Sequence, residues 1–125
     1  MVNIQTRKIT DGLASLVKQI DSLVDDAGKR GAATKHAFVV LISNDPDEAE
    51  STLEEFSKKT EIKNIPLTVF DGVAGPRGYK IAKDAEVTVM LWVNARVSVN
   101  LAFGEGELDD DAVAKVVAAA KEHLR

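Results

Sequence analysis

Cysteine is absent from this sequence, and its absence excludes disulfides, thiolate metal sites and thiol catalysis. Basic charge is also scarce, because 16 Lys and Arg residues are outnumbered by 20 Asp and Glu, which gives a net charge of −4. A mildly acidic chain lacks the positive surface that attracts phosphate backbones or anionic lipids. We therefore expect neither nucleic acid nor a membrane among its partners.

Long hydrophobic runs are missing as well. No apolar stretch approaches the ~18–20 residues that a membrane-spanning helix needs, and segment 1–8 has no apolar core of the signal-peptide type. These features predict a cytoplasmic protein, although a chain whose export signal had been removed would look the same.

The sequence has 125 residues, of which 45% are hydrophobic and 29% are charged. Such a length and composition are typical of one globular domain, covering 1–125.

Helix and strand patterns alternate along the chain. Apolar residues recur with helical spacing over 9–27 and from Leu108 onward. Asp45, followed by Pro46 and Glu48, predicts the start of a helix that reaches about Lys59. A short helix is expected at 79–83, and strands are expected at 2–5, 37–43, 65–70, 87–92 and 97–103.

Two of the expected strands differ in their patterns. The run 37–43 is continuously apolar, which predicts a central parallel strand that is buried on both faces. In 97–103, apolar and polar or small residues alternate, which predicts a strand near an edge of the sheet. The order of elements predicts an α/β fold, in which a mixed β-sheet with a parallel core plus a C-terminal hairpin is flanked by helices on both faces.

The second half of the chain carries a series of recognisable patterns. Tyr79-Lys80-Ile81 precedes the apolar strand at 87–92, Asn94-Ala95 follows that strand, and Gly104 to Leu108 leads into the last helix. In this order the segments resemble the helix, the Pro-Thr strand, the Asn-Gly hairpin and the closing helix of the thioredoxin-like superfamily, including its redoxin branch. By element order the resemblance extends over nearly the whole chain, and it implies a thioredoxin-like sheet.

The departures from this family concern its redox site. Where the family has cysteine, at the start of the helix after the central strand, this sequence reads Asn44-Asp45-Pro46-Asp47. Thiol–disulfide exchange needs a thiolate, which no hydroxyl or carboxylate replaces. The family's cis-proline position holds Val87, where we expect a trans bond because a cis bond before a non-proline residue costs ~2.5–4 kcal/mol. The resemblance therefore implies a redox-inactive member, without thiol–disulfide oxidoreductase or thiol peroxidase activity.

The candidate binding site lies where the resemblance places the family's active site. The carboxyl ends of parallel strands meet there, and ligands favour such crevices. Two interpretations stay open, namely a retained groove for a peptide or small molecule, and helix caps and turns that persist after the loss of catalysis. The candidate groove residues are Asn44, Asp45, Pro46, Gly75, Pro76, Arg77, Val87 and Thr88.

Acidic residues and histidines show no pattern of a metal or catalytic site. Asp45, Asp47, Glu48 and Glu50 lack the spacing and the glycine of a calcium-binding loop, and helix capping accounts for the first and third of them. The two histidines are not accompanied by a nucleophile elbow. We expect no cofactor, no metal and no catalytic residue.

Together these features predict a non-catalytic binding or scaffold module, which holds a protein or peptide partner at the former active-site end or at a sheet edge. Two alternatives remain. One is a redoxin-related enzyme with non-thiol chemistry around Asn44, Asp45 and Thr88. The other is a structural subunit of a homo-oligomer, such as a homodimer paired through the exposed last strand.

Overall fold

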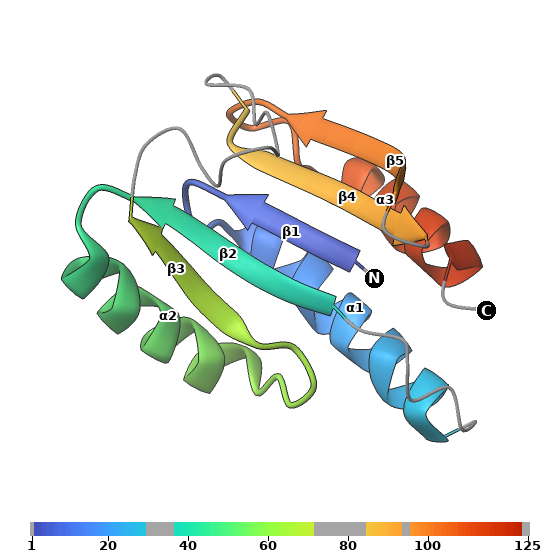
Figure 1. Cartoon of the computed structure of the whole chain (residues 1–125), viewed down its shortest axis with the longest axis horizontal. Coiled ribbons are helices and arrows are strands. Elements are labelled where there is room, and N and C mark those ends of the chain that lie inside the picture. The colour runs from blue at the N-terminus through green and yellow to red at the C-terminus, as the bar shows by residue number, and fades with distance from the viewer. Residues whose placement is uncertain (1, 30–36, 72–84, 94–95, 124–125) are drawn as a thin grey trace.

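The chain forms an α/β domain. The computed structural model describes residues 2–29, 37–71, 85–93 and 96–123 (Figure 1). In chain order the elements of this part are β1 (Val2–Thr6), α1 (Asp11–Lys29), β2 (Ala37–Ser43), α2 (Pro46–Thr60), β3 (Leu67–Asp71), β4 (Val87–Val93), β5 (Arg96–Phe103) and α3 (Asp110–His123). Each element expected within these ranges is confirmed, with ends shifted by one or two residues. The helix expected at 79–83 and the Asn94-Ala95 segment lie outside the described residues.

The five strands form one mixed sheet in the order β3-β2-β1-β4-β5. β1 pairs in parallel with β2, and β2 pairs in parallel with β3. β4 is antiparallel to β1, and β5 is antiparallel to β4. The expected parallel core with a C-terminal hairpin is therefore confirmed, and β3 and β5 are the two edge strands of the described sheet.

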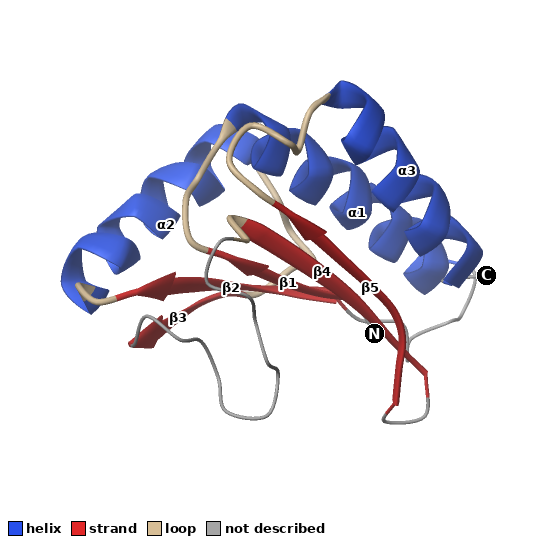
Figure 2. Cartoon of the chain, turned by 90° about the horizontal axis from the view of Figure 1, so that it is seen from above, coloured by secondary structure: helices blue, strands red, loops and turns tan. Residues whose placement is uncertain are grey.

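All three described helices lie on one face of the sheet (Figure 2). The prediction of helices on both faces is therefore not met within the described residues. The reason lies in the strand order, because the β1–α1–β2 and β2–α2–β3 crossovers both step toward the same edge. Crossovers of the usual right-handed kind that step in one direction place their helices on the same face.

The main hydrophobic core lies between this face and the helices. From α1, Leu13, Leu16, Val17 and Ile20 have no exposed surface, as the helical spacing of the sequence predicted. Alternate residues of the sheet strands pack against these side chains, namely Val2, Ile4, Val39, Val87, Val89 and Leu91. Helix α3 contributes Val113, Val116 and Ala120 to the same core. On the opposite face of β2, Val40 and Ile42 are buried and Phe38 is half-buried, so the predicted burial of this strand on both faces is confirmed.

Helix α2 has a well-defined start and end. Oδ1 of Asp45 accepts the backbone N–H of Glu48 at 3.2 Å, and Pro46 occupies the first turn. The helix ends at Thr60, and the next residue, Glu61, caps it with its backbone in the left-handed conformation at φ 55°. Its inward side chains, among them Leu53 and Phe56, are buried against the sheet and α1.

Candidate functional site

The expected site residues 44–46 lie at the carboxyl end of β2, where they form the entry to α2. Asp45 donates its backbone N–H to Oγ of Ser43 at 3.0 Å, and its carboxylate caps the helix through Glu48. Asn44, Asp45 and Pro46 are all exposed. Capping therefore explains the role of Asp45, whereas Pro46 lines a groove between α2 and β3 that is described below.

Val87 and Thr88 lie at the same end of the sheet, but they face opposite ways. Val87 pairs with Thr6 at the end of β1, and its side chain is buried in the helix-covered core. Thr88 points to the other face and is 5% exposed. Because β1 lies between β2 and β4, neither side chain joins residues 44–46 in one groove. Gly75, Pro76 and Arg77 lie outside the described residues, and the described peptide bonds, including the one before Val87, are trans.

A small hollow of about 220 Å³ does lie near this end, but different residues form it. Its lining includes Arg7 and Lys8 from the segment after β1, Ser43 from the end of β2 and Glu48 from the start of α2. Arg7 is used structurally, since its backbone N–H donates to the carbonyl of Glu86 at 2.8 Å and its Nε donates to that of Ala85 at 3.2 Å. The sequence reasoning missed this hollow, and the adjacent basic pair after the first strand was the available signal.

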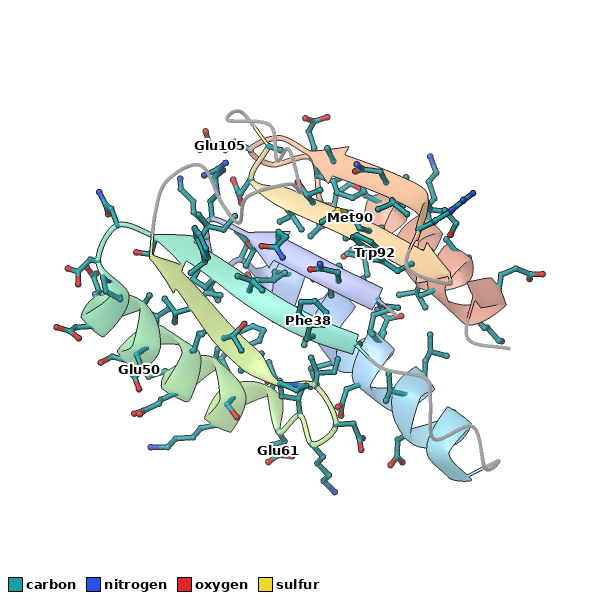
Figure 3. All side chains as sticks on the ribbon, in the orientation of Figure 1. Phe38, Glu50, Glu61, Met90, Trp92 and Glu105 are labelled. Atoms are coloured by element: carbon teal, nitrogen blue, oxygen red, sulfur yellow. The ribbon has the colours of Figure 1, made fainter. Side chains whose placement is uncertain are left out.

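A polar cluster lies on the face of the sheet opposite the helices. Asn3, Gln5 and Thr88 are each at least nine-tenths buried, and Gln5 Nε2 donates to Asn3 Oδ1 at 2.8 Å. Pairing places Asn3 between Phe38 and Met90, which Figure 3 shows on the same face of the sheet. The described residues offer no hydrogen-bond partner to Asn3 Nδ2, Gln5 Oε1 or Thr88 Oγ1.

Each buried polar atom without a hydrogen-bond partner lowers the stability of the folded state by about 1–3 kcal/mol. Amide and aliphatic hydroxyl groups do not ionise near neutral pH, so these three side chains offer hydrogen bonds and not acid–base chemistry. The alternating pattern of β1 was too short for the sequence analysis to single out Asn3 and Gln5 as an inward-facing pair.

A groove of about 600 Å³ lies between α2 and β3, and we call it the α2–β3 groove. Its floor is apolar and its helix side carries two carboxylates. The lining residues are Pro46, Glu50, Leu53, Glu54, Ser57, Ile62, Ile65, Leu67, Thr68 and Val69. Figure 1 shows α2 running along the outer side of β3, and Figure 3 marks Glu50 on this helix.

The connection that closes one end of the groove is held in place by α1. The carboxylate of Asp21 accepts the backbone N–H of Asn64 at 2.7 Å and that of Lys63 at 3.2 Å. These bonds fix the segment that carries Ile62 and Ile65, which line the groove. The hollow is therefore pre-formed, with one wall tied to the main body of the protein.

Other site types find no support among the described residues. No group of His, Asp and Glu side chains in this part is arranged to hold a metal ion. None of the described helices is long and apolar enough to cross a membrane. No protein-family model, curated protein or solved structure matches the chain. Among the described residues, the α2–β3 groove is therefore the feature best suited to hold a ligand.

Proposed function

We propose that this chain is a non-catalytic binding module that holds a segment of a protein partner in the α2–β3 groove. The observation that carries the proposal is the combination of a hollow of about 600 Å³ with the outer edge of strand β3, which pairs with no further strand among the described residues. Recognition clefts of this type combine an apolar floor with a few polar groups that orient the ligand. Leu53, Leu67 and Val69 supply the apolar floor, and Glu50 and Glu54 supply the polar margin.

This proposal keeps the expected class of function and changes its location. At the sheet end Asp45 is engaged in capping, whereas the sheet edge at β3 carries a hollow of ligand size, which Pro46 also lines. A parallel core with a C-terminal hairpin also supports our proposal that the domain is a cysteine-less, thioredoxin-like domain. In such a domain, binding at the edge would not depend on the redox site that the sequence lacks.

A pair of variants on α2 tests the location. Ser57 lines the groove and is half-buried, so Ser57→Trp would place a large side chain in it. Ser51 is exposed on the same helix and does not line the groove, so Ser51→Trp is the matched control. Peptides would be selected from a random displayed library on the unchanged protein and then measured against both variants.

We expect the selected peptides to bind Ser51→Trp as they bind the unchanged protein and to lose at least about tenfold in affinity for Ser57→Trp. Circular dichroism would verify that both variants fold. The proposal is wrong if no peptide is enriched, or if the folded Ser57→Trp variant binds the peptides as well as the control does.

A further inference from the structure

Strand β3 presents unpaired backbone groups along the α2–β3 groove. The backbone N–H of Val39 donates to the carbonyl of Pro66 at 3.0 Å, and Val39 lies opposite Leu67 in the parallel register. In a parallel ladder this arrangement directs the N–H and C=O groups of Leu67 and Val69 away from β2, toward the free edge. The same two residues direct their side chains to the groove floor. A free edge next to a groove is the arrangement that accepts an additional strand from a peptide.

The dimensions of the groove suit a short extended segment. β3 has five residues, which span about 16 Å at the rise of a β-strand. A strand added beside it would direct every second side chain toward α2, because α2 lies on the helix-covered face and beside this edge (Figures 1 and 2). Those alternate side chains would lie over Leu53, while the others would face away from α2.

The charged side chains among the described lining residues of the groove are all acidic. Glu50 and Glu54 are exposed and line it, and no Lys or Arg is among its described lining residues. The basic residues of α2's last turn, Lys58 and Lys59, do not contribute to the lining. The groove therefore favours a cationic occupant, whose long aliphatic stems can cover the apolar floor while the charged ends reach the carboxylates.

The spacing of the two carboxylates matches that of an extended chain. Glu50 and Glu54 are four residues apart on a helix, which corresponds to about 6 Å along its axis. Alternate residues of a β-strand are separated by about 6.6 Å. We infer that the α2–β3 groove binds an extended peptide segment in which two basic residues are separated by one residue, and that this segment adds to β3 as a sixth strand of the described sheet. This inference depends on the proposed function, because it names the occupant of the same groove.

Two synthetic peptides of equal composition test the spacing. One is Thr-Lys-Thr-Lys-Thr-Val, with both lysines on one side of an extended chain, and the other is Thr-Lys-Lys-Thr-Thr-Val, with lysines on opposite sides. We expect the alternating peptide to bind at least about fivefold more tightly at low salt, and the difference to shrink as salt screens the charges. Equal affinity of the two peptides would overturn the inferred spacing.

Two neighbouring carboxylates on α2 test the charge contacts. Glu54 lines the groove, whereas Glu55 lies on the side of α2 that faces α1 and is also exposed. We expect Glu54→Gln to weaken binding of the alternating peptide about two- to fivefold and Glu55→Gln to leave it unchanged. Equal effects of the two substitutions would show that the peptide responds only to the net charge of the protein, and the inference would be wrong.

Hydrogen exchange followed by NMR tests strand addition directly. In the free protein the amides of Leu67 and Val69 should exchange quickly, while that of Thr68, which faces β2, should be protected. The alternating peptide should slow exchange at Leu67 and Val69. Protection that appears only in β5, the other edge strand, would overturn the inference. If library peptides remain sensitive to Ser57→Trp but show no basic alternation and no amide protection in β3, the proposed function stands and this inference fails.

Discussion

Replacing Thr88 with valine is expected to stabilise the protein, although it removes a polar group from a polar cluster. The side chain of Thr88 is 5% exposed, and its hydroxyl has no hydrogen-bond partner among the described residues. Valine has nearly the same shape and replaces the hydroxyl with a methyl group. The free energy of unfolding should therefore rise, because a buried hydroxyl that loses its hydration without a new partner costs about 1–3 kcal/mol in proteins.

The expected gain is about 1–2 kcal/mol, since some of the penalty is relieved by local relaxation. For a chain of 125 residues this corresponds to a rise in melting temperature of about 4–8 °C, from the usual entropy of unfolding per residue. Urea denaturation would measure the free energy of unfolding and its dependence on urea concentration. That dependence should not change, because the substitution alters neither the fold nor the surface exposed on unfolding.

The control is Thr88→Ser, which keeps the hydroxyl and deletes the buried methyl group. It should lower the free energy of unfolding by about 1 kcal/mol. A Thr88→Val variant that is less stable than the unchanged protein by 1 kcal/mol or more would refute the reasoning. The hydroxyl would then have a partner in solution, such as a bound water molecule or ligand, and Asn3 and Gln5 would need the same interpretation.

Two further substitutions test the helix starts by thermal and urea denaturation. Asp45→Ala should lower the free energy of unfolding by about 1 kcal/mol, because it removes the bond to the Glu48 amide. Asp45→Asn, which keeps a capping oxygen, should retain most of that stability. An Asp45→Ala variant with unchanged stability would contradict the capping role. Gly12→Ala should lower the free energy of unfolding by about 1–3 kcal/mol, because an added Cβ would collide with the backbone carbonyl of Leu108. A stabilised variant would contradict this close contact between α1 and the segment before α3.

The two faces of the sheet differ in the polarity of their buried side chains. The helix-covered face is apolar and holds α1 and α3 together, which accounts for most of the buried core. The opposite face mixes buried amides and a hydroxyl with aromatic and aliphatic side chains. The binding site that we propose belongs to neither face alone, because it lies at the edge, where α2 stands beside β3 (Figure 1).

Local sequence patterns were sufficient to predict the described elements. The spacing of Leu13, Leu16 and Ile20 predicts α1, and the Asp45-Pro46 pair predicts the start of α2, because capping and amphipathic periodicity act over only a few residues. The continuous run 37–43 and the alternating run 97–103 correctly distinguished an inner strand from an edge strand. These features depend on neighbouring residues in the chain, so they can be read without knowing the fold.

The site could not be predicted in the same way. In the sequence, Glu50 and Glu54 look like an ordinary exposed helix face, and Leu67 and Val69 look like an ordinary strand. Only the strand order, in which both crossovers step toward β3, places that helix face beside a free backbone edge. The same tertiary arrangement separates residues 44–46 from Val87 and Thr88, because β1 lies between their strands. Contacts between segments distant in the chain depend on how the sheet is assembled, which short-range patterns do not encode.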